Sequence, residues 1–201
     1  MKKILLSAIL VSSLFANKDT YIEAGIGFSN SKDNFSTSSK SNISSLNDAE
    51  DEKSAIALVN FNYSYDLSED TSLYAGMDLG TLYFGSNINS QLGSFDIGIM
   101  TSFDQEWENP FTTNANRKET DVNEFGTFLG YGFSLGKSHQ AQLQYSYSKR
   151  EYDKETVQAD LKRDGTRHVW SFENSINSDN FTFLINTNYE NYDAQGDSSS
   201  Y

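Results

Sequence analysis

The chain has 201 residues, no cysteine and a net charge of −13, which becomes −15 if Lys2 and Lys3 are removed with an N-terminal signal. The lack of cysteine excludes disulfides and thiolate metal sites, and the acidic balance argues against nucleic acid, whose binding needs a basic surface. Aromatic residues make up 14% of the chain although its mean hydropathy is −0.58. That combination is typical of a transmembrane barrel, which has aromatic girdles outside and a polar interior.

The first 16 residues predict a secretory signal peptide. Lys2 and Lys3 form a positive start, residues 4–14 are apolar apart from three serines, and Ala16 supplies a small residue for cleavage. Leu14 departs from the small residue preferred there, but cleavage after Ala16 remains the prediction. The apolar run is shorter than the roughly 20 residues of a membrane-spanning helix. No cysteine follows it, so a lipoprotein anchor is excluded.

Alternation of apolar and polar residues with period two predicts β-strands along the rest of the chain. Residues 20–29 alternate first, and a polar loop rich in Ser, Asn and Asp covers residues 30–53. A second polar loop is predicted over residues 151–165. The expected strands cover residues 20–29, 54–66, 72–83, 94–103, 123–135, 140–150, 166–176 and 181–192.

These eight segments of about ten residues have the length of tilted transmembrane strands. We therefore predict an all-β fold, an antiparallel transmembrane β-barrel of eight or more strands, over residues 17–201. Short turns at residues 67–71, 136–139 and 177–180 should lie on the same side of the barrel. With only one predicted strand, 94–103, between the segments 72–83 and 123–135, they do not. Either residues 104–122 contain another strand or one predicted strand is false. Residues 197–201 resemble a loop rather than a terminal aromatic strand, so the barrel is expected to be incomplete.

A soluble β-sandwich or lipocalin-like barrel also alternates, so alternation alone does not exclude it. The export signal, the aromatic residues near strand ends and the unequal loop lengths favour the transmembrane barrel. The signal and the segments 20–29, 54–66, 123–135 and 140–150 resemble the Gram-negative outer-membrane β-barrels. Within that class the chain is most similar to the small barrels of uncharacterised, domain-of-unknown-function families. The resemblance implies a fold and a place in the outer membrane, and it implies no ligand.

The alternation assigns side chains to two faces of the expected barrel. Residues expected to face the lumen are Gln140, Gln142, Gln144, Asn186, Asn188 and Glu190. Residues expected to face lipid are Phe61, Tyr63, Phe133, Tyr145, Tyr147 and Phe183. Possible lipopolysaccharide contacts are Lys149, Arg150, Lys162 and Arg163, because Arg and Lys pair with phosphate. Ordinary surface charge, balanced by neighbouring carboxylates, is the alternative for these four.

The chain offers little for catalysis. A serine hydrolase needs a His within reach of a Ser, but His139 and Ser138 are adjacent and point apart, and His168 and Ser171 fall on opposite faces. The acidic run around residues 48–52 lacks the ligand spacing of a calcium loop. We therefore expect no enzyme activity, no metal and no cofactor.

The expected function is that of an integral outer-membrane barrel with a pore for small polar solutes, favouring cations because the lumen is acidic. Two alternatives remain open. One is a non-conducting structural or surface-binding barrel that acts through loops 30–53 and 151–165, and the other is a soluble periplasmic carrier. The expected partners are outer-membrane lipid, lipopolysaccharide and the export and barrel-assembly machinery.

Overall fold

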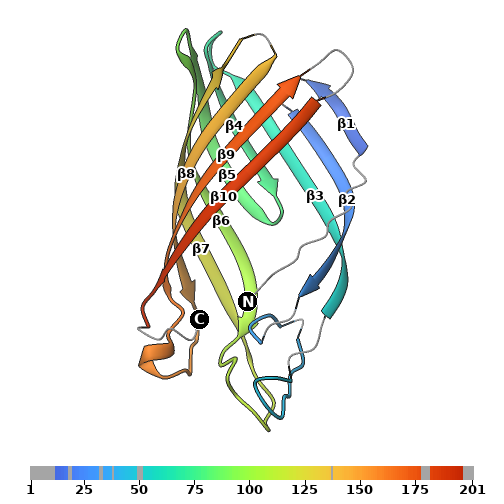
Figure 1. Cartoon of the computed structure of the whole chain (residues 1–201), viewed down its shortest axis with the longest axis vertical. Helices are drawn as coiled ribbons and strands as arrows, with labels where there is room; N and C mark the ends of the chain where they lie inside the picture. Colours follow the sequence, from blue (N-terminus) through green and yellow to red (C-terminus); the bar gives the residue numbers. More distant parts are fainter. Residues whose placement is uncertain are drawn as a thin grey trace.

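Ten antiparallel strands form one curved sheet in the computed structural model, which describes residues 12–17, 20–31, 34–37, 39–48, 52–136, 138–177 and 182–196 (Figure 1). Each strand pairs with the next along the chain, so the sheet is a meander without crossovers. The strands are β1 (Ser12–Asn17), β2 (Thr20–Ser31), β3 (Glu52–Asp66), β4 (Thr71–Asp78), β5 (Thr81–Ser90), β6 (Gly93–Trp107), β7 (Glu119–Ser134), β8 (His139–Tyr152), β9 (Gly165–Asn177) and β10 (Thr182–Ala194). One 3₁₀ turn, η1 (Ala159–Leu161), lies between β8 and β9.

The sheet curls into most of a barrel wall but is not closed, because β1 and β10 stand at its two ends and do not pair with each other in the described part of the chain. The predicted all-β antiparallel fold and its incompleteness are therefore confirmed. Short turns gather at one end of the wall. The described parts of the long connections, residues 34–37, 39–48, 108–118 and 153–164, gather at the other (Figure 1). We call these the turn end and the loop end. Among the described residues, no helix is long and apolar enough to cross a bilayer.

Seven of the eight predicted strands occur, but the segment 72–83 is wrong as a single strand. It contains the end of β4, a two-residue turn and the start of β5. The turn residues have positive φ, 47° at Leu79 and 85° at Gly80, as a type I′ hairpin requires. The sequence signal for this turn was weak, because Leu79 occupies the position where Asn or Asp would predict a type I′ turn.

This hairpin also explains why the eight predicted strands did not place all the short turns on the same side. The additional strand is β5, at residues 81–90, and residues 104–122 contain only the ends of β6 and β7 with a loop between them. With β5 counted, β3, β5, β7 and β9 all end at the turn end. The hairpin tip itself stops about halfway along the wall (Figure 1).

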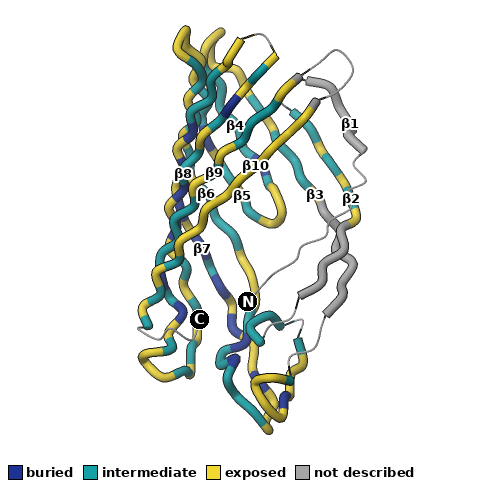
Figure 2. Tube along the Cα trace, in the orientation of Figure 1, coloured by how far each residue is buried: buried dark blue, intermediate teal, exposed yellow. Residues whose placement is uncertain are grey.

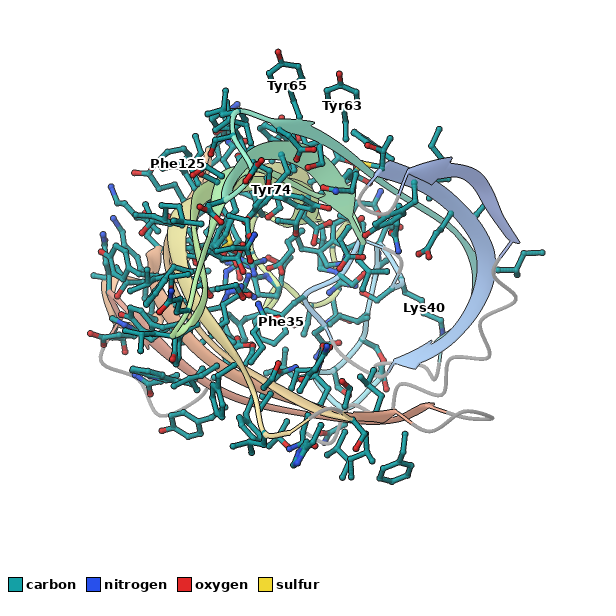
Figure 3. The ribbon with its side chains drawn as sticks, turned by 90° about the horizontal axis from the view of Figure 1, so that it is seen from above. Phe35, Lys40, Tyr63, Tyr65, Tyr74 and Phe125 are labelled. Atoms are coloured by element: carbon teal, nitrogen blue, oxygen red, sulfur yellow. The ribbon has the colours of Figure 1, made fainter. Side chains whose placement is uncertain are left out.

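The two faces of the wall differ in polarity. Tyr63, Tyr65 and Phe125 point outward, whereas Tyr74 and Phe35 lie inside the ring (Figure 3). The register carries this assignment to neighbouring strands, because paired residues share a face. Large apolar side chains exposed on the convex face include Ile97 and Ile99 on β6, Leu129 on β7, Leu143 on β8, Trp170 and Phe172 on β9, and Ile185 and Tyr189 on β10.

Burial is concentrated on the concave face and at the loop end (Figure 2). β7 shows this most clearly, since its buried and exposed residues alternate along most of its length. The few buried apolar side chains include Ile43, Trp107 and Val122, all near the loop end. Within the described residues, no second layer of helices or strands lies behind the sheet, and the interior is formed mainly by one face of the wall.

β1 falls within residues 1–16, the predicted signal peptide, apart from its last residue. It pairs with β2 through Ser12↔Ala24 and Leu14↔Ile22. Cleavage after Ala16 stays a prediction, and it would make β2 the edge strand of the mature chain.

Glycines on the concave face are covered by aromatic rings from the next strand. A Cβ built at Gly85 would lie 2.7 Å from the Tyr74 ring and its hydroxyl oxygen. Gly76 has the same relation to Tyr83, and Gly98 to Phe128. The rings occupy the space that a side chain would need, so these glycines are required for the close approach.

Replacing Gly85 with alanine should therefore destabilise the wall. We expect a loss of about 1–3 kcal/mol in the free energy of unfolding, because the Tyr74 ring must move to admit the methyl group. Urea titration in detergent measures it. The cost should fall when Tyr74→Ala is added, and an equal cost in both backgrounds would contradict the packing argument.

The Leu79 turn makes the opposite prediction. Leu79→Asn should stabilise the protein by about 1 kcal/mol, because Asn tolerates positive φ far better than Leu. Gly80→Ala is the matched change that should destabilise the same turn. Both shifts are read from unfolding midpoints, and a destabilised Leu79→Asn variant would refute the strain at this turn.

Candidate site: the polar interior of the wall

The predicted lumen residues all lie on the concave face of the register. Gln142 and Gln144 pair with Gly132 and Gly130 of β7, opposite residues on the inner face. Gln140 belongs to the same row, and Asn186, Asn188 and Glu190 continue it on β10. The six residues predicted to face lipid, Phe61, Tyr63, Phe133, Tyr145, Tyr147 and Phe183, lie on the convex face. Whether lipid covers that face stays a prediction.

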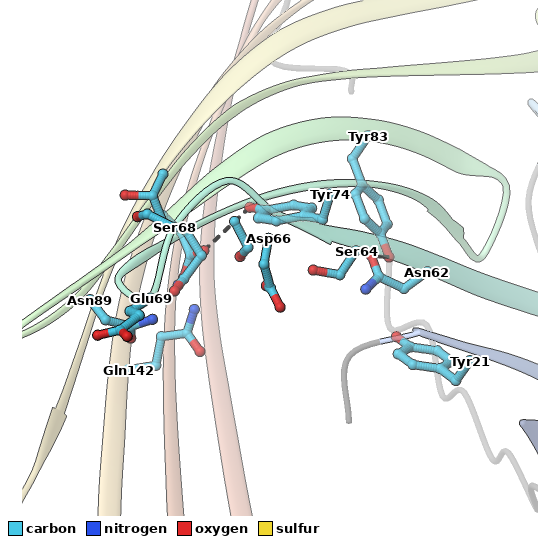
Figure 4. A pocket seen from close by; sticks show the side chains of 14 residues that line it. Tyr21, Asn62, Ser64, Asp66, Ser68, Glu69, Tyr74, Tyr83, Asn89 and Gln142 are labelled. Atoms are coloured by element: carbon cyan, nitrogen blue, oxygen red, sulfur yellow. Dashed lines mark hydrogen bonds between the residues drawn. The ribbon is translucent and has the colours of Figure 1, made fainter. Parts of the chain in front are cut away.

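A polar cavity of about 750 Å³ occupies the turn end of the interior (Figure 4). It contains three carboxylates, Asp66, Glu69 and Asp96, and no Lys or Arg is among its lining residues. Tyrosines, amides and hydroxyls complete its surface, namely Tyr21, Tyr74, Tyr83, Asn62, Asn87, Asn89, Gln142, Ser64, Ser68, Ser72 and Thr71. Such a surface can hydrate and pass polar solutes, and its charge favours cations.

Asp96 connects three strands in this cavity. The Asn87 amide of β5 donates to its Oδ1 at 3.0 Å, and the Tyr74 hydroxyl of β4 lies 3.4 Å from the same oxygen. The carboxylate therefore sits in a polar frame on the inner face of β6. Sequence alternation placed Asp96 opposite Phe95 and Ile97, but could not show which neighbours it meets.

The loop end of the interior is occupied by a network around Arg163. Its guanidinium pairs with Glu106 at 2.9 Å and with Glu155 at 2.7 Å, and donates to the Trp107 carbonyl at 2.8 Å. It also lies 4.2 Å from the ring centroid of Tyr152, close enough for a cation–π contact. Arg163 is 2% exposed, so this is a buried ion cluster in which each charge has a partner.

Two further arginines extend the network across β8 and β9. Arg150 pairs with Glu106 at 2.7 Å, and Arg167 pairs with Glu124 at 2.7 Å. The Ser148 hydroxyl also donates to Glu124, which is buried. These contacts join β6, β7, β8 and β9 side by side at their loop-end halves and narrow the interior there.

The polar loop predicted at 30–53 is shorter than expected, because β2 extends to Ser31 and β3 begins at Glu52, and its described part is not a free surface loop. Residues 34–37, 39–48 and 108–118 pack together over the loop end, and we call them the loop-end cap. Arg117 holds the cap together: it donates to the carbonyls of Asn34, at 2.8 Å, and Lys40, and lies 4.6 Å from the Trp107 ring centroid. Figure 3 shows Phe35 of the cap inside the ring.

The residues predicted to contact lipopolysaccharide separate into two pairs. Arg150 and Arg163 are turned inward and hold carboxylates, so neither lies on the convex surface, where lipopolysaccharide contacts were expected. Lys149 and Lys162 are exposed and remain candidates, although Lys149 pairs with Glu151 at 2.6 Å. The alternation assigns Lys149 and Arg150 to opposite faces, but the buried position of Arg163 in a loop gave no sequence signal.

The histidines lie on the convex face beside polar partners other than serine. His139 Nε2 is 2.9 Å from Asn174 Oδ1, and His168 Nδ1 is 2.8 Å from the Tyr145 hydroxyl. In the acidic run, Asp48 accepts hydrogen bonds from Ser44 and Ser45 in a local turn, and the Ser44 hydroxyl chiefly lowers its pKa. Residues 49–51 of this run lie outside the described part of the chain. No group of metal ligands occurs among the described residues.

Fold and site together define an open all-β barrel wall with an apolar convex face, a polar interior and a capped loop end. Residues 19–201 match a family described as protein of unknown function (DUF2860), and the chain belongs to that family. The resemblance to uncharacterised β-barrels is thus confirmed at the level of an uncharacterised family and an all-β fold. No curated protein and no solved structure matches the chain significantly.

The buried network makes a mutational prediction. Arg163→Met should lower stability by about 3–5 kcal/mol, because Glu155 and Glu106 lose their shared buried partner. Lys162→Met, one residue earlier and exposed, is the matched control and should change stability little. Thermal unfolding in detergent and protease cleavage within residues 153–164 measure the effect. Similar behaviour of the two variants would show that the network does not stabilise the loop end.

Proposed function

We propose that the chain forms the wall of an integral outer-membrane β-barrel and that its polar interior provides a path for small polar solutes, with a preference for cations. The observation that carries this proposal is which face of the wall is apolar and which is polar. Apolar side chains cover the convex face and polar ones cover the concave face. Soluble monomers rarely expose apolar patches larger than a few hundred Å², whereas a barrel in lipid requires such a surface.

The length of the apolar band supports the same proposal. Outward-facing apolar residues run from Phe95 to Phe103 on β6 and from Phe125 to Phe133 on β7. These stretches match the roughly 9–11 residues of a tilted transmembrane strand. Beyond them, toward the loop end, the convex face becomes polar, with Gln105, Asp121, Asn123, Lys149 and Glu151. Strand ends of this kind would stand in the headgroup region and the water beyond it.

The aromatic residues on the convex face also fit a membrane surface. Tyr145 packs against Trp170 with the rings tilted and their centroids 4.6 Å apart, and the ring centroids of Phe95 and Tyr131 are 4.9 Å apart. Cross-strand aromatic pairs stabilise neighbouring strands, and their amphipathic rings suit a bilayer interface. The predicted signal peptide supports export, which outer-membrane insertion requires.

The alternatives fit the geometry less well. A soluble carrier would point its apolar face inward around a ligand, but the interior cavity is lined mainly by polar groups. A non-conducting barrel acting through its loops is favoured by one observation, the ordered loop-end cap and the ion network beneath it. Conductance decides between these two barrels. No catalytic role is part of the proposal.

The membrane proposal predicts detergent-dependent extraction and heat-modifiable migration of the full chain. Folded barrels resist unfolding in cold detergent, so unheated and boiled samples should migrate differently on a gel. The protein should also fractionate with membranes after high-salt washing. Recovery of folded protein in the aqueous phase without detergent would overturn the proposal.

The pore proposal predicts cation-selective current in planar bilayers. Asp96→Asn should shift the reversal potential in a salt gradient toward zero, because it removes one of three carboxylates from the turn-end cavity. Asp121→Asn removes the same charge from the convex face and should leave selectivity unchanged. Absence of channel steps from a heat-modifiable, membrane-inserted protein would favour the non-conducting barrel.

A further inference from the structure

The wall is interrupted between β3 and β6, at a place that does not depend on either end of the chain. The β4–β5 hairpin separates these strands, and it ends at Leu79 and Gly80. β4 pairs with β3 only over residues 61–66, and β5 pairs with β6 only as far as Ser102. Within the described residues, the loop-end half of β3 and residues 103–107 of β6 therefore have no partner from this hairpin.

The loop-end cap closes the lower border of this interruption. Ser36 forms an isolated antiparallel bridge with Glu106, and the Trp107 amide donates to the Phe35 carbonyl at 3.0 Å. The cap thus covers the edge of β6 at residues 105–107 and leaves Phe103 and Asp104 between it and the hairpin tip. This interruption of strand pairing is bounded by β3, the hairpin tip, β6 and the cap, and we call it the side window (Figure 1).

A cavity of about 310 Å³ lies at the side window and extends into the interior. Its outer rim is apolar, since Leu79 and Phe103 are each 67% exposed. Its inner lining is polar and charged, with Thr81, Ser102, Asp104, Glu124, Arg150 and Arg167. An apolar rim next to a charged interior is the arrangement that an amphiphile with a polar head would match.

The charged groups in this cavity indicate which headgroup the amphiphile would carry. Arg150 and Arg167 each retain a buried Nε–H with no acceptor in the described structure, although both pair with carboxylates through other atoms. Asp104 forms no ion pair among the described residues and accepts only the neighbouring Gln105 amide, at 2.8 Å. The cavity thus offers unused cationic donors and an unused carboxylate, which suits a group that carries both an anion and a cation.

The position of the side window along the wall also fits an amphiphile with a polar head. Phe103 ends the apolar band on β6, and the next outward residue, Gln105, is polar. The side window therefore opens where the apolar band meets the polar strand ends. On the proposed membrane insertion, an amphiphile's head would reach the cavity from the bilayer interface while its chain stayed along the apolar convex face.

We propose that the side window binds a zwitterionic amphiphile, a phosphate-containing lipid whose head also carries an ammonium group. The phosphate accepts from Arg150 and Arg167, the ammonium approaches Asp104, and the chain lies against Leu79 and Phe103. This inference rests on the proposed membrane insertion but not on conduction through the interior.

The test uses the full chain in dodecyl maltoside with Trp170→Phe, which leaves Trp107 of β6 as the single tryptophan. Lysophosphatidylethanolamine with a brominated chain should quench Trp107 with a half-saturating concentration about tenfold below those of brominated lysophosphatidylglycerol and monoacylglycerol, a difference of about 1.4 kcal/mol. Equal quenching by the three head types, or no saturable quenching, would overturn the proposal.

Variants locate the binding. Ser102→Trp fills the cavity and should raise the half-saturating concentration about tenfold or more, whereas Ser72→Trp, on the inner face of β4 at the other cavity, should not change it. Asp104→Asn adds no bulk and should remove the preference for the ethanolamine over the glycerol head. Retention of that preference, or equal loss in both Trp variants, would refute the site. Heat-modifiable migration of each variant shows that it is folded, so failure here is distinguishable from failure of the membrane proposal.

Discussion

A single-layer sheet must satisfy two environments with one sequence, and this constraint explains most of the structure. Successive side chains of a strand point to opposite faces, so every strand has to alternate for both faces to be uniform. In most folds a second layer buries the apolar face. Here no described element covers the convex face, and the apolar residues remain exposed on it. The proposed bilayer would supply the missing layer.

The same constraint explains why charge is placed at the loop end of the interior. Only a few apolar side chains are buried there, because most of the inner face is polar, so paired charges and hydrogen bonds supply much of the cohesion. Arg163 is bound by two carboxylates, the Trp107 carbonyl and an aromatic ring, and is almost fully buried. Buried pairs of this kind add little net stability compared with apolar packing, but removing one member is costly. The network thus fixes the position of the loops more than it strengthens the fold.

How much the sequence could predict follows from the range of the interactions. Period-two alternation is local, so β2, β3 and β6 to β10 and the faces of Gln142 or Phe183 were predictable. The β4–β5 turn was missed because Leu79 is an unusual residue at positive φ. The roles of Arg117 and Arg163 depend on partners tens of residues away, which alternation does not reveal. Loop residues that looked like surface charge are the ones that organise the loop end.

The missed hairpin matters beyond strand counting, because its length sets the shape of the wall. A hairpin as long as β3 and β6 would pair with the full length of the edges that these strands turn toward it. The wall between the interior and the outside would then be continuous at this place. By ending at Gly80, the hairpin leaves a gap that the loop-end cap reaches across only at residues 105–107 of β6. In a bilayer, unpaired backbone facing lipid is costly, so an interruption there is tolerable only where polar groups or a bound head satisfy it. The charged lining behind the gap, with Asp104 and two arginines, places polar groups next to that interruption. The early β4–β5 turn, with Leu79 at positive φ, is therefore the feature that connects the polar interior to the outer surface.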